Sequence, residues 1–147
     1  MAACEILLAE DNDADVTLVQ RALALQEIDC NLHIVRDGRQ AIAFLEQLER
    51  DRYPRYLDLL LLDIRLPKHD GKEVLKRLRA TERLGLTPVV VITGSDSPSL
   101  EASVTKLAAL QVFRKPLDPA EFMRLGEIVR DILTARGRYY PRERSIA

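Results

Sequence analysis

Acidic residues crowd one short stretch of the chain, LLAEDNDADV at 7–16, directly behind an apolar run. Glu10, Asp11, Asp13 and Asp15 lie so close together that their charges repel, by roughly 4 kcal/mol for a pair about 4 Å apart at a protein surface. The carboxylates must therefore either point apart or share a counter-charge. A divalent cation supplies one, because Mg²⁺ prefers oxygen ligands and keeps waters that phosphate oxygens can replace.

Three further residues with useful chemistry follow short apolar runs: Asp63, Thr93 and Lys115. A carboxylate such as Asp63 can act as a nucleophile and form an acyl phosphate. Thr93 and Lys115 can hold the other phosphoryl oxygens, and Gly94 leaves room for the incoming group because it has no side chain. One Mg²⁺ and Lys115 together neutralise three carboxylates, so the residue types predict a metal-assisted phosphoryl site.

These residues meet only if the fold brings distant segments together, and alternating apolar and amphipathic stretches indicate how. The patterns predict strands at 6–9, 32–35, 57–64, 88–93 and 112–114, and helices at 15–26, 40–48, 71–83, from Ser99 onward and at 122–133. Five strand–helix units predict an α/β fold, a doubly wound five-stranded parallel sheet in the flavodoxin-like order 2-1-3-4-5.

Ligands bind such a sheet at the carboxyl ends of its strands. Asp63, Thr93 and Lys115 are each expected at that edge, beside Glu10 and Asp11. Asp13 and Asp15 lie beyond the site, where a helix begins, so we expect both side chains to be solvated. Asp15 is also a candidate for the helix N-cap.

At these residues the sequence resembles the receiver domain of two-component response regulators. The likeness rests on the segments LLAEDN, LLLLDIRLPKHDGKEVL, PVVVITGS and FRKPLD, and it runs from about Glu5 to Arg136. It implies a (βα)5 receiver domain at 1–136, followed by a basic tail at 137–147. It also implies a phosphoprotein that phosphorylates and dephosphorylates itself, rather than an enzyme of conventional turnover.

The resemblance assigns a role to each candidate residue. Asp63 matches the phosphoacceptor, Thr93 the switch hydroxyl and Lys115 the lysine that holds the phosphoryl group. The implied cofactor is Mg²⁺, and its implied ligands are Glu10, Asp11, Asp63 and the backbone carbonyl of Arg65. The chain departs from the family at Val112, where an aromatic residue usually completes the switch; Phe113 lies beside that position.

The run LPKHDGKEVL and the long loop before the third strand are most similar to single-domain regulators that partner phytochrome-type histidine kinases. The implied partner is a sensor histidine kinase, with the bacteriophytochromes as candidates, and the implied output is protein–protein contact. We also expect a homodimer through the fourth helix, fifth strand and fifth helix. That expectation rests on a wide apolar arc at 122–133 and on apolar surface from Val112 and Phe113.

Composition limits the other partners. The formal net charge of −1 gives no field that recruits nucleic acid, and no apolar stretch approaches the ~20 residues of a membrane span. Cys4 and Cys30 are expected to be free thiols in the cytoplasm. No DNA-binding domain is expected, because the chain ends soon after the fifth helix. The alternative is a receiver-like interaction module that no longer cycles phosphate.

Overall fold

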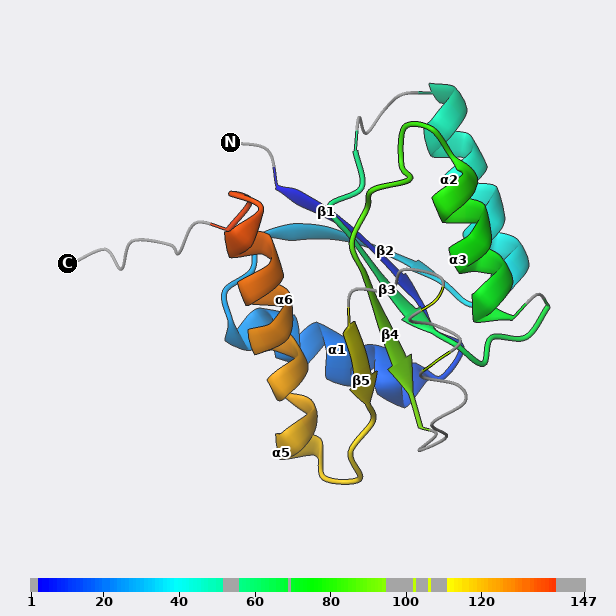
Figure 1. Cartoon of the computed structure of the whole chain (residues 1–147). Helices are drawn as coiled ribbons and strands as arrows, with labels where there is room; N and C mark the ends of the chain where they lie inside the picture. Colours follow the sequence, from blue (N-terminus) through cyan, green and yellow to red (C-terminus); the bar gives the residue numbers. More distant parts are fainter. Residues whose placement is uncertain are drawn as a thin grey trace.

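The computed structural model describes residues 3–51, 56–68, 70–94 and 111–139, together with Ala102 and Lys106. Its five strands form one parallel sheet in the order β2-β1-β3-β4-β5, which confirms the predicted topology (Figure 1). The strands are β1 (Cys4–Ala9), β2 (Cys30–Val35), β3 (Leu59–Asp63), β4 (Val89–Thr93) and β5 (Gln111–Arg114). The helices are α1 (Asp13–Leu25), α2 (Gly38–Asp51), α3 (Gly71–Ala80), α5 (Pro119–Phe122) and α6 (Arg124–Ala135).

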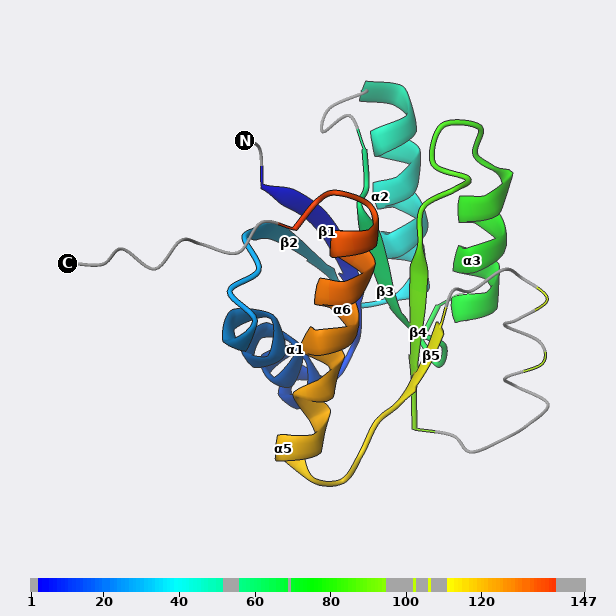
Figure 2. The same cartoon turned by 60° about the vertical axis from the view of Figure 1, so that its left-hand side comes forward.

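Helices cover both faces of the sheet (Figure 2). Leu60 and Leu62 of β3 pack against α2 and α3, whereas Leu59 and Leu61 pack against α1 and α6. Because each central strand is buried on both faces, its sequence is a continuous apolar run rather than an alternating one. The predicted fourth helix lies outside the described residues, apart from Ala102 and Lys106, which are helical.

The predicted fifth helix is divided in two. A turn at Met123 separates α5 from α6, and Phe122 at the end of α5 is buried against Phe113, with ring centroids 5.5 Å apart. Gly126 lets α6 approach α1 closely, because a Cβ there would lie 2.2 Å from the carbonyl oxygen of Ala22.

The expectation that Phe113 adds exposed apolar surface is wrong. Its ring is 8% exposed and belongs to the core beneath α1 and α6, whereas Val112 packs on the opposite face, toward α2 and α3. Successive residues of a strand point to opposite faces, so Phe113 does not occupy the side of the sheet on which Val112 lies.

The first and last described segments are tied together. Buried Asp58 accepts a hydrogen bond from the backbone N–H of Glu5 (2.8 Å) and pairs with Arg138 Nε (3.0 Å). The Cys4 thiol donates to the carbonyl of Arg138, and Tyr139 donates to the carbonyl of Gln26. The packed structure thus reaches residue 139; residues 140–147 of the predicted tail lie outside the described residues.

Both cysteines are free, as predicted. Burial raises the pKa of Cys30 to about 11 and also raises the pKa of Cys4, so both thiols stay protonated near neutral pH. Among the described residues, each helix is too short or too polar to cross a membrane.

Candidate phosphoryl and metal site

Strand ends position the candidate residues, as the sequence predicted. Glu10 directly follows β1, and its N–H donates to the carbonyl of Val35 (3.0 Å). Asp63 is the last residue of β3 and Thr93 the last of β4. Lys115 directly follows β5, and its N–H donates to the carbonyl of Thr93 (2.8 Å). The positions of these residues are therefore set by the hydrogen bonds of the sheet.

Three carboxylates gather at this edge. One oxygen from each of Glu10, Asp11 and Asp63 lies within 4.8 Å of the other two. Glu10 is fully buried, Asp63 is buried and Asp11 is exposed, so the cluster opens to solvent on one side. Oxygen donors at this separation can share one divalent cation.

Lys115 provides the positive charge of the site. Its Nζ lies 2.8 Å from Asp15 Oδ2, 3.0 Å from Glu10 Oε2 and 3.1 Å from Asp63 Oδ2. The lysine side chain is mostly buried, so the attractions are screened less than at an open surface.

The prediction that Asp15 is a solvated N-cap is wrong. The cap is Asn12, whose side chain accepts the N–H of Asp15 (3.0 Å). Asp15 lies in the first turn of α1 with only 22% of its side chain exposed, and it pairs with Lys115. Asp13 matches its prediction, since its side chain is 90% exposed and pairs with Arg36. Sequence reasoning missed Asp15 because its partner is 100 positions away.

The turn after Asp63 is tightly packed. The N–H of Arg65 donates to Asp63 Oδ1 (3.0 Å), and the N–H of Gly71 donates to the carbonyl of Ile64 (3.0 Å). A Cβ on Gly71 would lie 2.6 Å from the Cα of Ile64, so only glycine permits this approach. On the other side of the site, a Cβ on Gly94 would meet no atom of the described residues within 4 Å, which agrees with the expected open space.

The pKa of the acid Glu10 and the pKa of the base Lys115 are both raised, for different reasons. Burial raises the pKa of Glu10 to about 7; the Lys115 ammonium opposes that rise, and the charge of Asp63 adds to it. Burial alone would lower the pKa of Lys115, but its contacts with Asp15 and Glu10 and the charge of Asp63 outweigh burial and raise its pKa. The site can therefore hold a permanent cation beside an acid that ionises near neutral pH.

Known proteins resemble this chain in sequence and in fold. The family model described as "Response regulator receiver domain" matches residues 6–126. The response regulator Rcp1 of Synechocystis sp. is 50% identical over 91 residues, which are 61% of this chain and 61% of Rcp1. The matched part thus spans less than two thirds of that relative.

Two solved structures cover nearly the whole chain. The phosphorylated cyanobacterial phytochrome response regulator RcpA superposes with a TM-score of 0.80 at 32% identity, over 92% of this chain and 96% of RcpA. The Mn²⁺-bound form of Rcp1 superposes with a TM-score of 0.77 at 31% identity, over 98% of this chain and 99% of Rcp1.

Proposed function

The chain belongs to the response regulator receiver domain family, and from that membership we propose that it accepts a phosphoryl group from a histidine kinase on Asp63. The observation that carries the proposal is the position of Asp63. Its carboxylate ends β3 inside the acidic cluster, with one oxygen on the Arg65 N–H and the other on Lys115. The likeness to the phytochrome response regulator RcpA supports a phytochrome-type kinase as the donor, and the two free thiols support a cytoplasmic setting.

The proposed reaction transfers a phosphoryl group from a histidine of the kinase to Asp63. An oxygen of Asp63 attacks the phosphorus of a phosphohistidine, a P–O bond forms, and the P–N bond breaks as its electron pair returns to the imidazole. Water later attacks the acyl phosphate, which releases inorganic phosphate and restores the carboxylate. Lys115 lies 3.1 Å from the attacking group, where its charge offsets the charge that builds up on the phosphoryl oxygens.

We further propose Mg²⁺ as the cofactor. Glu10, Asp11, Asp63 and the carbonyl of Arg65 would hold it, and when bound it neutralises charge on the phosphoryl oxygens. The residues fit a divalent cation, because three carboxylates lie within reach of one ion and Lys115 alone offsets only one of their charges. The Mn²⁺-bound structure of the relative Rcp1 supports a divalent cation in this class of site.

A small phosphodonor tests this proposal without the kinase. We expect incubation with acetyl phosphate and Mg²⁺ to add one phosphoryl group, seen by intact mass spectrometry and removed by mild base. With EDTA in place of Mg²⁺, the adduct should be absent. A protein that stays unmodified with Mg²⁺ would instead support the alternative, a receiver-like module that does not cycle phosphate.

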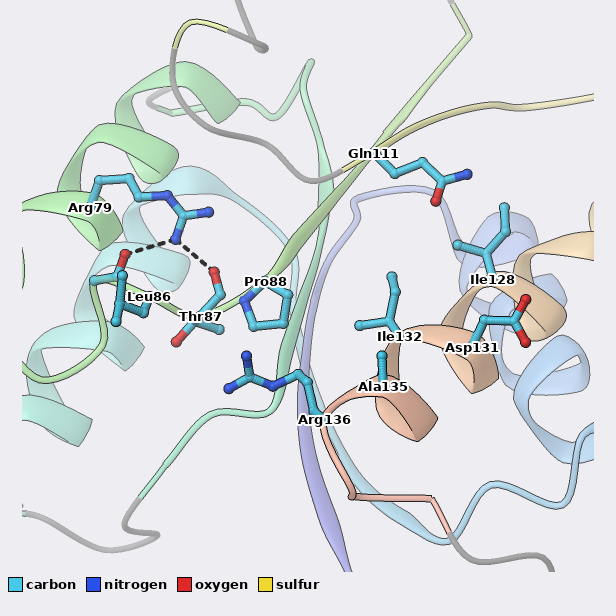
Figure 3. Close-up of a pocket in the computed structure, with 11 residues that line it drawn as sticks. Arg79, Leu86, Thr87, Pro88, Gln111, Ile128, Asp131, Ile132, Ala135 and Arg136 are labelled. Carbon is cyan, nitrogen blue, oxygen red and sulfur yellow. Dashed lines mark hydrogen bonds between the residues drawn. The ribbon is translucent and has the colours of Figure 1, made fainter.

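A groove at the other end of the strands, away from the phosphoryl site, supports a second proposal, a homodimer (Figure 3). The cavity has a volume of about 970 Å³ and lies between the loop before β4 and the second half of α6. Its apolar lining includes Leu86, Pro88, Ile128 and Ile132, and Leu86 is 91% exposed. Gln111 extends the lining to β5, which links the groove to the expected dimer surface.

The charges on the rim favour a second copy of the chain as the occupant. Arg79 is engaged by the carbonyls of Gly85 and Thr87 (3.0 and 2.6 Å). The other charged groups of the lining are Asp131, which is largely exposed and lies 3.3 Å from its neighbour Arg130, and Arg136 at the end of α6. In a two-fold contact the same patch faces itself, so Asp131 of one copy can meet Arg136 of the other. One patch with an apolar centre and both signs of charge is self-complementary.

Leu86→Asp is expected to shift the protein from dimer to monomer. Because the contact is symmetric, each substitution places two buried charges in the interface, while the exposed position leaves folding nearly unchanged. Light scattering at tens of micromolar measures the change. The matched control is Leu117→Asp, since Leu117 is also exposed but lies outside the groove. A monomeric wild type, or equal loss in both variants, would contradict the proposed interface.

A further inference from the structure

The ammonium of Lys115 is fully used by three carboxylates. An ammonium has three N–H donors, and Nζ has three carboxylate oxygens within 3.1 Å, from Asp15, Glu10 and Asp63. The shortest of these contacts is the one to Asp15 Oδ2, at 2.8 Å. A further anion at Lys115 must therefore displace an acceptor that is already there.

Asp15 differs from the other two acceptors in origin and in role. Glu10 and Asp63 end strands and belong to the acidic cluster, whereas Asp15 comes from the first turn of α1 and lies outside that cluster. Its backbone is fixed, because its N–H is bound to the side chain of the cap residue Asn12. Of the three acceptors of Lys115, Asp15 is thus the one that is neither the proposed nucleophile nor a proposed metal ligand.

A phosphoryl group on Asp63 would bring further negative charge to the position where Lys115 already contacts that residue. Asp15 would then compete with the phosphoryl oxygens for the ammonium, and its own charge would repel them across a distance of a few ångströms. In the resting protein the same contact spreads the lysine's charge over three acceptors instead of two.

We propose that Asp15 is a positioning residue that holds Lys115 in competition with the phosphoryl group and so limits how strongly the phosphorylated state is favoured. This inference rests on the proposed function of Asp63. A carboxylate at this position makes the phosphoryl group easier to return or to lose, which suits a protein that passes a signal on rather than storing it.

The test measures the affinity of a phosphoryl mimic, beryllium trifluoride, in saturating Mg²⁺. We expect Asp15→Asn to bind it about tenfold more tightly than wild type, because the amide keeps the shape of the side chain and removes its charge. Asp13→Asn is the matched control, since it removes a charge from the same helical turn but its partner is Arg36. It should bind the mimic as wild type does. A residue of merely structural importance would weaken binding when changed, not strengthen it.

The outcomes separate this inference from the proposed function. If wild type binds the mimic and Asp15→Asn binds it no more tightly than Asp13→Asn, the role of Asp15 is overturned and the role of Asp63 stands. If wild type fails to bind the mimic in Mg²⁺, the proposed phosphoryl site is overturned, and this inference with it. Thermal unfolding of the three proteins confirms that each is folded during the measurement.

Discussion

Asp63→Asn is expected to abolish the phosphoryl adduct while leaving the fold intact. The amide has the shape of the carboxylate and can still accept the N–H of Arg65, but it is neutral and a poor nucleophile. The labelling rate with acetyl phosphate and Mg²⁺ should fall by at least about a thousandfold. Intact mass spectrometry before and after mild base measures the loss.

Asp58→Asn provides the matched control for this experiment. Asp58 is also buried and lies just before the other end of β3, where it pairs with Arg138 rather than with Lys115. The variant should lose some stability, because one partner of a largely buried ion pair becomes neutral. It should nevertheless acquire the adduct at close to the wild-type rate. Undiminished labelling of Asp63→Asn would show that another residue accepts the phosphoryl group.

Without Mg²⁺, the free energy of unfolding is expected to fall as the pH rises from about 4.5 to about 7, and Glu10→Gln should remove this fall. The pKa of Glu10 is raised from 4.5 to about 7 in the folded protein. Folding therefore favours the protonated form of the Glu10 carboxyl. The contribution of Glu10 to the free energy of unfolding is complete below pH 4.5 and is lost as the pH rises through about 7. The full difference amounts to about 3 kcal/mol.

Urea unfolding at about pH 5 and about pH 8 compares the two proteins. Glu46→Gln is the control, since Glu46 is a half-exposed glutamate that pairs with Arg77 on the surface, and it should keep the wild-type dependence. Saturating Mg²⁺ should offset the fall, because a cation that binds the ionised cluster stabilises the folded state by mass action. Parallel pH profiles for wild type and Glu10→Gln would contradict the buried acid as their cause.

Local patterns were sufficient to predict the sheet. The central strands are apolar on both faces, so β1, β3 and β4 stand out as short runs, and their order follows from the repeated strand–helix unit. Because all five strands run parallel, Glu10, Asp63 and Lys115 lie together at the carboxyl ends of their strands. Strand and helix ends were predicted less well, and α2 is longer at both ends than its apolar spacing at 40–48 suggested.

Both errors concern a side chain whose position depends on a contact with another element. Asp15 has the sequence features of an N-cap, yet Asn12 takes that role and leaves Asp15 free to contact Lys115. Phe113 was expected at the surface because β5 is an edge strand, but Phe122, from the turn of helix α5, covers its ring. Lys115 is 100 positions from Asp15, whereas Phe122 follows Phe113 closely in the chain but belongs to another element, so neither contact can be read from the pattern of a single strand or helix.

The contact between Cys4 and Arg138 has a consequence for how such a unit can be combined with other proteins. The thiol of Cys4 lies 3.0 Å from the carbonyl oxygen of Arg138, so the first and last segments of the packed structure lie side by side. A domain with adjacent ends can be inserted into a surface loop of a host without forcing the host's chain apart. The same adjacency allows a short linker to join the ends while new termini are opened elsewhere. This domain can therefore be inserted into other proteins as a unit, and its phosphoryl site then lies at the end of the sheet that is far from the points of attachment.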